Sequence, residues 1–302
     1  MSVNITVLCP FGLDAGLVSR AAELGCVRVL VPHGAAEEAA KYGAEKIHTL
    51  PDSFRCADEA AFALWLQERL TVWGDEIVLA PATVQMRSIL PMTAWHLQAG
   101  LTADCTALSL ADGRLLQTRP AFGNSLMADI ETLSPIQMAT VRPGTFRPVK
   151  TPKKAAVTEE APPAESQCVK LLEENAQGGG VTLHQADIVV AGGAGIGSKE
   201  GFVKLEKLAE KLGGAVAASR CAVDAGYAPY RAQVGMTGVT VSPKVYIAVG
   251  ISGAVQHLAG MSGAEKVIAI NSDPKAPIFD YADYGFVGDW ETVVDKLLEE
   301  LP

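Results

Sequence analysis

Residues 245–271 contain two short apolar runs joined by a glycine turn and a short helix-like stretch. The first run, Val245–Val249, is rich in β-branched residues and ends at Gly250. The second run, Val267–Ile270, follows the helix-like stretch at once. A strand, a turn, a helix and a strand in so short a segment predict a right-handed crossover between parallel strands. The chain is therefore expected to contain a parallel α/β sheet.

The turn of this crossover has the chemistry of a ligand site. Its backbone N–H groups and the positive end of the following helix suit an anion. Ser252, Gln256 and His257 add side chains that form hydrogen bonds, and the second strand ends in the polar residue Asn271. Open α/β sheets bind ligands at the carboxyl ends of their strands. We therefore expect a ligand at this edge of the sheet.

The same residues carry a resemblance to a known family. The run Tyr-Ile-Ala-Val-Gly-Ile-Ser-Gly-Ala-Val-Gln-His at 246–257, closed by Ala-Ile-Asn at 269–271, resembles the signature of the α subunit of electron transfer flavoproteins. Further phrases follow in that family's order at 218–220, 224–226, 233–235, 237–238, 276–279 and 282–285. The resemblance covers nearly all of 186–290 and, more loosely, the first half of the chain.

Composition limits the class of protein. With 302 residues, of which 49% are apolar and 20% charged, the chain should form two domains that each bury a core. Its formal charge of −9 argues against nucleic acid or an anionic membrane surface as the main partner. No apolar segment approaches the roughly 18 residues that a bilayer-spanning helix needs. Strand-like residues begin at Asn4 without a charged region of signal type before them. We expect no integral membrane segment and a cytoplasmic location.

The cysteines do not indicate a metal site. The six lie at positions 9, 26, 56, 105, 168 and 221, too far apart for a zinc knuckle or an iron–sulfur centre. A disulfide framework is not expected in a long chain without a secretory signal. Reduced, buried thiols and no metal cofactor are the prediction.

The first half alternates between strand-like and helix-like segments. Strands are expected at 5–9, 27–31, 46–50 and 76–80, and helices at 14–24, 35–42, 58–72 and 83–97. This alternation predicts a parallel sheet with helices on both faces. After Gly100, the Asp112-Gly113 pair is a hairpin signal between strands expected at 103–110 and 114–119. With further strands expected at 127–131 and 137–141, these segments should form an antiparallel edge or extension of the first sheet.

Residues 148–167 are expected to connect the domains. They contain four prolines and clusters of both charge signs, which is typical of a solvated connector. The resemblance places a last strand of the first domain at 168–175. The predicted domains are 1–180, which in that family supports the flavin domain and packs against the partner subunit, and 181–302, a Rossmann-like FAD-binding domain.

The second domain is expected to begin with a dinucleotide-type turn. A strand at 187–191 leads into the glycine-rich turn 192–197 and a helix capped by Ser198. The fingerprint is imperfect, because Ser198 holds the third glycine position and the next strand, 215–218, ends in Ser219-Arg220 rather than an acid. The turn is therefore either only a tight turn or a source of backbone contacts to phosphate.

The family resemblance implies an FAD site at the strand ends. In relatives Arg220 lies against the isoalloxazine with Ser219 beside it, Thr237 lies near N5, and His257 approaches the pyrimidine carbonyl edge. The turn at 252–257 and Asn271 hold the ribityl and pyrophosphate groups, and Asp289 with Trp290 reaches the adenosine end. The expected cofactor-binding residues are Ser219, Arg220, Val234, Gly235, Met236, Thr237, Ser252, Gly253, Ala254, Val255, Gln256, His257, Asn271, Asp289 and Trp290.

Each of these residues also has a purely structural alternative. Arg220 can form a surface ion pair, and His257 can pack or cap a helix. Ser252 and Thr237 can stabilise turns, while Asn271 and Asp289 can cap the segments that follow them. The structural alternatives do not explain why polar residues recur at successive strand ends. A guanidinium and an imidazole beside a flavin ring would stabilise its reduced forms and raise its potential.

Two positions depart from the family pattern. Ala194 stands inside the glycine turn where most relatives carry arginine, and Met236 replaces the glutamine before Thr237. Loss of a charge-assisted bond to the cofactor costs about 1.5–3 kcal/mol, or more than tenfold in affinity. We expect FAD to bind less tightly than in most relatives.

No catalytic residue is expected. The sequence has no Walker-type lysine loop, no HExxH and no Gly-x-Ser-x-Gly.

The resemblance implies an electron carrier that forms a heterodimer with a β subunit and accepts electrons from a flavin dehydrogenase, commonly one oxidising acyl-CoA in fatty acid β-oxidation. It would pass them to a quinone reductase or another acceptor. One alternative is an electron-bifurcating form that uses NADH and ferredoxin. Another is a nucleotide-binding scaffold protein with a weakened flavin site. An NAD-dependent dehydrogenase is disfavoured by the missing acidic ribose anchor.

Overall fold

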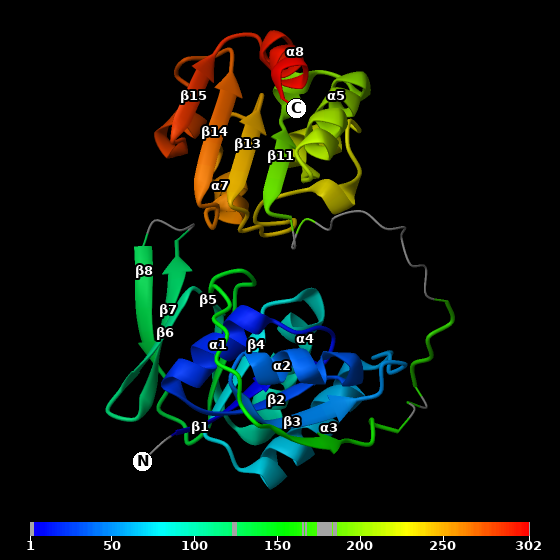
Figure 1. Cartoon of the computed structure of the whole chain (residues 1–302), viewed down its shortest axis with the longest axis vertical. Helices are drawn as coiled ribbons and strands as arrows, with labels where there is room; N and C mark the ends of the chain where they lie inside the picture. The colour runs from blue at the N-terminus through cyan, green and yellow to red at the C-terminus, as the bar shows by residue number, and fades with distance from the viewer. Residues whose placement is uncertain are drawn as a thin grey trace. The chain divides into compact units, whose positions relative to one another are not determined.

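The chain divides into two compact units, which are residues 1–176 and 177–302 (Figure 1). The computed structural model describes residues 3–122, 126–164, 166, 168–173, 183 and 186–301. The domain boundary expected between 180 and 181 lies outside these residues. Each unit is built around a parallel sheet, so the prediction of an α/β protein is confirmed.

Unit 1 contains a seven-stranded sheet in the order β10-β3-β2-β1-β4-β9-β5, and all of its strand pairs are parallel. Its strands are β1 (Val3–Leu8), β2 (Gly25–Pro32), β3 (Ala44–Leu50), β4 (Ile77–Pro81), β5 (Gly100–Cys105), β9 (Gln137–Val141) and β10 (Ala156–Glu159). Its helices are α1 (Ala15–Leu24), α2 (Ala36–Lys41), which follows the 3₁₀ turn η1 (His33–Ala35), α3 (Glu59–Trp73) and α4 (Val84–Leu97).

Two cores lie on the two faces of this sheet because neighbouring strand residues point in opposite directions. Val7 of β1 packs with α1 and α2, whereas the next residue, Leu8, packs with α3 and α4. The helix ends follow from local chemistry. The Asp58 carboxylate accepts hydrogen bonds from the backbone N–H groups that open α3, and Gly74 ends that helix in the left-handed conformation.

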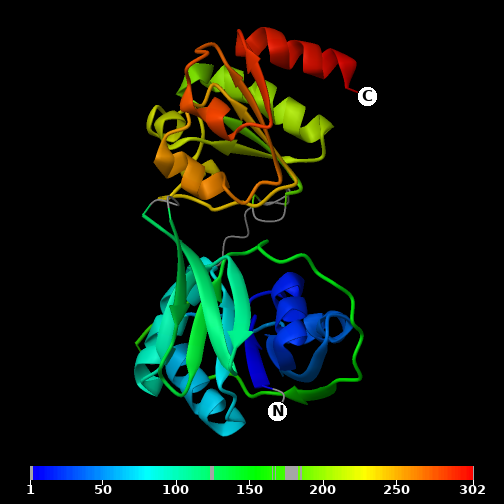
Figure 2. The ribbon, with the colours of Figure 1, turned by 90° about the vertical axis from the view of Figure 1, so that its left-hand side faces the viewer.

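The strands after Gly100 are arranged differently from the prediction. The hairpin at Asp112-Gly113 is confirmed, since β6 (Ala107–Ala111) and β7 (Arg114–Ala121) pair antiparallel, and β8 (Leu126–Glu131) joins β7. These strands form a separate three-stranded sheet (Figure 2). The expected single strand at 103–110 is wrong, because Asp104 has a φ of 60° and the chain turns there from β5 toward β6. β9 is buried along its whole length and lies inside the parallel sheet.

The connector is also more structured than predicted. Within 148–167, β10 pairs in parallel with β3 and forms the edge of the sheet. Glu160, just after β10, accepts from Nδ1 of His48 at 2.6 Å, and Trp65 donates to the carbonyl of Ala161 at 3.1 Å. These bonds satisfy polar groups at the edge of the sheet and hold the segment there. The strand expected at 168–175 is wrong for 168–173, which have no strand, and its last two residues lie outside the described ones.

Unit 2 contains a five-stranded parallel sheet in the order β12-β11-β13-β14-β15. Its strands are β11 (Ile188–Gly192), β12 (Ala215–Ala218), β13 (Val245–Val249), β14 (Lys266–Asn271) and β15 (Tyr284–Val287). Its helices are α5 (Lys199–Lys211), α6 (Arg220–Asp224), α7 (Val255–Met261) and α8 (Trp290–Glu300), with 3₁₀ turns η2 (Ala194–Ile196), η3 (Tyr230–Ala232) and η4 (Pro277–Tyr281).

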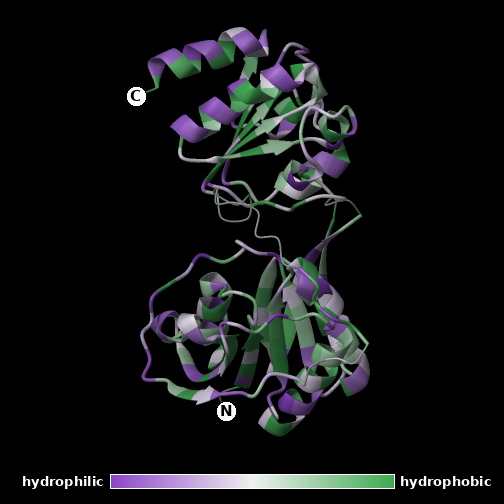
Figure 3. Ribbon diagram, turned by 90° about the vertical axis from the view of Figure 1, so that its right-hand side faces the viewer, coloured by the Kyte–Doolittle hydropathy of each residue, from purple (hydrophilic) through white to green (hydrophobic). Residues whose placement is uncertain are grey.

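The helices of unit 2 cover both faces of its sheet. Phe202 of α5 and Val294 of α8 share one core, and Leu258 of α7 belongs to the core on the other face. Figure 3 shows hydrophilic and hydrophobic turns alternating along α5 and α8, whereas the strands of the sheet that these helices cover are mostly hydrophobic. After β12 the chain returns past β11 to form β13 on its other side. The carboxyl ends of β11 and β13 therefore form a topological switch point, where sheets of this class bind ligands.

No helix among the described residues has the length and apolar character needed to cross a membrane.

Candidate cofactor site

A cavity of about 590 Å³ lies at the carboxyl edge of the unit 2 sheet. The strands end there in register, because Gly192 pairs with both Ala218 and Val249, and Val249 pairs with Ile270. The residues that follow this row surround the cavity. They are Ala194, Gly195, Ser219, Arg220, Cys221, Gln233, Val234, Gly235, Met236, Thr237, Gly250, Ile251, Ser252, Ala254, Gln256, His257, Asn271, Asp273, Ala276 and Pro277.

Two glycine turns meet at the base of this cavity. A Cβ atom on Gly193 would lie 2.0 Å from the carbonyl oxygen of Gly250, so only glycine permits the approach. The N–H of Gly195 donates to the same carbonyl at 3.1 Å. Close packing of these two turns therefore explains the glycine at position 193 without any ligand. Ala194 and Gly195 still line the cavity, so the phosphate-contact alternative is compatible with this geometry.

Polar side chains hold the loops around the cavity. Nδ2 of Asn271 donates to the carbonyl of Ile251 at 2.8 Å, which ties the end of β14 to the turn after β13. Nε2 of Gln233 donates to Oγ1 of Thr237 at 2.9 Å. The hydroxyl of Thr237 thus serves as an acceptor on one side and retains its own proton for a second bond. Asn271 and Gln233 act as positioning residues for the lining.

Arg220 provides the cation of the cavity wall at the start of α6. Ser219 caps this short helix by accepting from the N–H of Ala222 at 3.3 Å, which fixes the backbone from which Arg220 extends. The Arg220 side chain is 67% exposed, and its Nε lies 3.4 Å from Oδ2 of Asp224. Arg220 therefore forms the predicted surface ion pair and also lines the cavity, while its contact with the isoalloxazine stays a prediction.

His257, like Gln233, is a buried polar residue of the lining. Its residue is 6% exposed, and its Nε2 lies 2.9 Å from the hydroxyl of Tyr246. Burial lowers the pKa of His257 to about 4, because the charged imidazole loses its hydration. The nearby backbone of Val234 opposes part of this shift. Nδ1 has no hydrogen-bond partner among the described residues. The imidazole is therefore neutral near pH 7 and acts as a dipole rather than a cation.

Comparison with known proteins assigns the chain to a family. A family model described as the electron transfer flavoprotein domain matches residues 12–165, and one described as the electron transfer flavoprotein FAD-binding domain matches residues 182–262. The chain belongs to the electron transfer flavoprotein α subunit family. The cavity lies largely within the second match, so FAD is the cofactor of this unit.

Curated relatives agree with the family models. The chain is 46% identical over 247 residues to the electron transfer flavoprotein subunit alpha of Thermoanaerobacterium thermosaccharolyticum, a match that covers 80% of this chain and 75% of the relative. It is 39% identical over 297 residues to the subunit of that name from Paracoccus denitrificans, covering 95% and 94%. The corresponding subunit from Bacillus subtilis is 38% identical over 269 residues, covering 88% and 83%.

The lining fits a flavin. The exposed guanidinium of Arg220 and the hydroxyl of Thr237, whose oxygen accepts from Gln233, are groups that hydrogen-bond the polar edge of such a ring. Ile251, Val234 and Pro277 supply apolar surface in the same cavity for its flat faces. Close glycine contacts bring backbone groups to the base, where a side chain would fill the space. The donor set therefore matches the cofactor that the family model names.

Most of the residues predicted from the sequence come together here. Gly253, Val255, Asp289 and Trp290 do not line the cavity. Gly253 instead packs against the backbone of Ile278, and Asp289 caps α8 by accepting from the N–H of Thr292 at 2.9 Å. Trp290 lies in the core beside α5. Contacts of Asp289 and Trp290 with the adenosine end of FAD remain a prediction.

Sequence reasoning missed part of the lining. The residues in question are Cys221, Gln233, Gly250, Ile251, Asp273, Ala276 and Pro277, whereas Ala194 and Gly195 belong to the turn for which phosphate contacts were one alternative. Several had a signal that was not used, since Gly250, Gln233 and Ala276-Pro277 lie in segments that resemble the family. Cys221 and Asp273 had no such signal. They become part of the site only because each follows closely after a strand end that borders the cavity.

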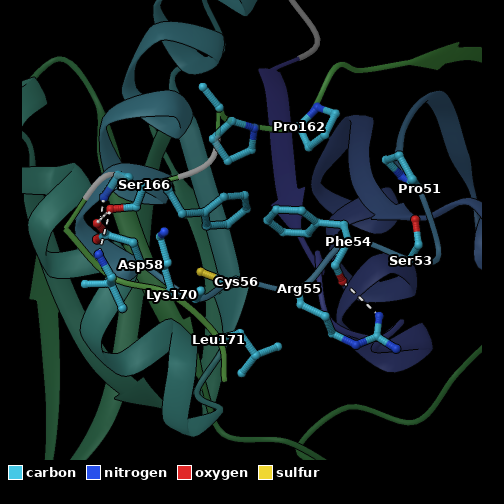
Figure 4. A pocket seen from close by; sticks show the side chains of 16 residues that line it. Pro51, Ser53, Phe54, Arg55, Cys56, Asp58, Pro162, Ser166, Lys170 and Leu171 are labelled. Atoms are coloured by element: carbon cyan, nitrogen blue, oxygen red, sulfur yellow. Dashed lines mark hydrogen bonds between the residues drawn. The ribbon is translucent and has the colours of Figure 1, made fainter. Parts of the chain in front are cut away.

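A second cavity, of about 490 Å³, lies in unit 1 between the loop at 51–58 and residues 162–171 (Figure 4). Phe54 and Phe62 line it, and the centroids of their rings are 5.4 Å apart. Its Asp58 side chain already caps α3 and accepts from Ser166 at 2.5 Å, while Arg55 donates to the carbonyl of Phe54. These polar groups hold the loop and the connector together, and the cavity lies outside the residues that match the FAD-binding domain.

Proposed function

We propose that the chain is the FAD-holding subunit of an electron transfer flavoprotein heterodimer. It accepts electrons from a flavin dehydrogenase, such as one oxidising acyl-CoA, and passes them to a quinone reductase or a similar acceptor. The observation that carries this proposal is the convergence of Arg220, Thr237 and His257 on one cavity at the switch point of the unit 2 sheet. A β subunit completes the heterodimer, as the names of the related proteins suggest for those proteins.

The residues of the cavity have separable roles. Bound FAD supplies the reversible electron transfer itself. Arg220 provides a positive charge that favours electron density on the flavin ring and so raises its reduction potential. Thr237 offers a hydroxyl donor whose oxygen is held by Gln233. Asn271 holds the turn after β13 against the end of β14, which keeps the backbone donors of that turn in place. None of these groups needs to act as an acid or base.

The proposal is tested by co-expressing the chain with its β subunit. The purified heterodimer should absorb visible light as a flavoprotein, retain or take up added FAD, and lose that absorbance when dithionite reduces it. It should then be reoxidised by an electron acceptor of the quinone reductase class. A heterodimer that is colourless and takes up no FAD would contradict the proposal.

A scaffold protein with a weakened flavin site is the second candidate, and Ala194 is the observation that favours it. This residue lines the cavity, and the family resemblance implies that most relatives carry an arginine there, which would give the cofactor one more cation. The two candidates differ in one measurement. An electron carrier must reduce and reoxidise its flavin repeatedly in the presence of a dehydrogenase and an acceptor, whereas a scaffold needs no such turnover.

A further inference from the structure

Strand β10 is the least anchored strand of the unit 1 sheet. It is the outermost strand on its side, and it pairs with β3. All four of its side chains are exposed, whereas every other strand of this sheet buries side chains. Without apolar burial, the backbone hydrogen bonds of a short edge strand do little more than offset the entropy cost of ordering it. β10 therefore needs an anchor outside its own four residues.

Glu160, the residue that follows β10, is that anchor. Its side chain is only 11% exposed. Its Oε1 accepts from Nδ1 of His48 at 2.6 Å, and its Oε2 accepts from Nη1 of Arg69 at 3.4 Å. Its backbone N–H donates to the carbonyl of Thr49 at 2.9 Å. This one residue therefore joins the end of β10 to both β3 and α3.

His48 is itself positioned by an ion pair inside unit 1. An arginine side chain can only donate, so Nη1 of Arg28, which lies 3.0 Å from Nε2 of His48, donates to that nitrogen. Burial lowers the pKa of His48, so the imidazole is neutral near pH 7 and its proton lies on Nδ1, toward Glu160. Arg28 is held in turn by Asp75 at 2.7 Å. The donor that receives Glu160 is therefore in place before β10 docks.

The preceding residue, Glu159, offers a contrast within the same segment. Its Oε1 lies 3.6 Å from Nδ1 of His33, and the His33 and Glu159 side chains are 55% and 79% exposed. Exposed ion pairs of this kind contribute little to stability. Two neighbouring glutamates thus each face a histidine, but only Glu160 does so in a nearly buried position.

We propose that β10 is a detachable strand, that Glu160 is the lock which holds it on β3, and that release of β10 lengthens the connector between the sheets of the two units. This inference goes beyond the proposed function and does not depend on it, because neither β10 nor Glu160 lines the cofactor cavity.

The contacts on either side of β10 determine how much chain is released. Before it, the N–H groups of Thr151 and Lys153 donate to carbonyls of α2 at 2.9 and 3.0 Å. After it, Trp65 donates to the carbonyl of Ala161 at 3.1 Å, and Ser166 donates to the carboxylate that caps α3 at 2.5 Å. The later contacts are single side-chain hydrogen bonds, so we expect them to open together with β10. Residues 154–166 would then add up to roughly 45 Å of extended chain to the connector.

Hydrogen exchange of the full chain, followed by mass spectrometry of its peptides, tests the lock. Glu160→Ala should raise the exchange rate of residues 155–161 about tenfold or more, because it removes hydrogen bonds that involve a charged group. Residues 166–171 should exchange faster as well, since two of their N–H groups donate to the hydroxyl of Ser166. Strand β1 should keep its wild-type rate.

The matched control is Glu159→Ala, which removes the same carboxylate one residue earlier and should leave the exchange of residues 155–161 at the wild-type rate. Unchanged exchange in Glu160→Ala, or equal acceleration in both variants, would overturn the lock. Acceleration of β1 by the same factor would mean a general loss of stability and would overturn it too. Acceleration confined to residues 155–161 would overturn the lengthening of the connector.

Trypsin provides a second test, because cleavage after Lys154 requires release of the residues that follow it. The Glu160→Ala variant should be cut there about tenfold faster than the wild type, and Glu159→Ala should be cut at the wild-type rate. A wild-type chain that is cut after Lys154 as fast as Glu160→Ala would show that β10 is not locked, and would overturn the proposal.

Discussion

The Nε atom of Arg220 lies 3.4 Å from Oδ2 of Asp224, one helical turn along α6. Their side chains are 67% and 66% exposed, so water and salt screen their attraction. Asp224 therefore holds the guanidinium only weakly. Arg220 stays available to a ligand in the cavity that it lines.

Replacement of Arg220 by alanine should weaken FAD binding more than tenfold and lower the reduction potential of the bound flavin. The physical reason is the loss of a charge-assisted hydrogen bond, which contributes about 1.5–3 kcal/mol. FAD titration and dithionite potentiometry of the heterodimer measure both effects. Arg220→Lys should restore part of the potential, because it restores the charge without the planar guanidinium.

The matched control for Arg220→Ala is Lys244→Ala. Lys244 is also an exposed cation of unit 2, and it pairs with Asp187 at the opposite end of the sheet. Its removal should leave FAD affinity and potential unchanged. Equal losses in both variants would reduce the role of Arg220 to a contribution to net charge.

The Asp224→Asn variant should be nearly as stable as the wild type. An exposed ion pair of this kind contributes about 0–1 kcal/mol, so the free energy of unfolding should change little. FAD affinity should stay the same or rise, because the carboxylate no longer competes with the cofactor for Arg220. Urea unfolding and FAD titration at low salt test this pair of expectations. A marked fall in affinity would show that Asp224 holds Arg220 in its binding position.

Replacement of Ala194 by arginine should tighten FAD binding by about tenfold or more. Ala194 lines the cavity and is exposed, so a longer side chain has room to reach an anionic group of the cofactor. A new charge-assisted bond is worth about 1.5–3 kcal/mol. The control Val203→Arg adds the same charge on the exposed side of α5, outside the cavity. No gain in affinity beyond that control would contradict the expectation.

The sequence was sufficient to predict the parallel sheets because their strands are local apolar runs between amphipathic helices. It did not predict the place of β9, which lies between β4 and β5. Strand order depends on contacts between residues far apart in the chain, and a short apolar run does not specify its neighbours. β10 was missed for a related reason. Its four residues are exposed, so they lack the alternation that indicates a strand, and pairing with β3 orders them.

The site was predictable where it depends on strand ends. Parallel strands bring their carboxyl ends to one edge, so Ser219, Ser252 and Asn271 were expected to meet, and all three line the cavity. The environment of each side chain was not predictable. Tyr246 was part of a familiar run, yet nothing in its spacing from His257 indicated a buried hydrogen bond. Such pairs depend on how α7 packs against β13.

The pKa of His257 should make unit 2 less stable in acid. Its pKa falls from an ordinary 6.5 to about 4 on folding, because burial disfavours the charged imidazole. Between pH 4 and pH 6.5, His257 is therefore protonated in the unfolded chain but neutral in the folded chain. The stabilisation is complete above pH 6.5 and is lost as the pH falls toward 4, by about 3 kcal/mol in total. The difference in unfolding free energy between the wild type and His257→Gln, followed against pH, isolates this contribution from that of the other histidines.

The Asp75→Asn variant should destabilise unit 1 by about 3–5 kcal/mol. Oδ2 of Asp75 accepts from Nε of Arg28 at 2.7 Å and from the hydroxyl of Thr6 at 2.6 Å. The Arg28 and Asp75 side chains are only 11% and 4% exposed, so removal of the negative charge leaves a nearly buried guanidinium without its counter-ion.

Glu45→Gln is the control in the same unit, because the Lys153 and Glu45 side chains are 51% and 39% exposed. It should change stability by less than about 1 kcal/mol. Urea unfolding of the full chain tests both variants, and similar losses in the two would mean that burial does not govern the strength of these ion pairs.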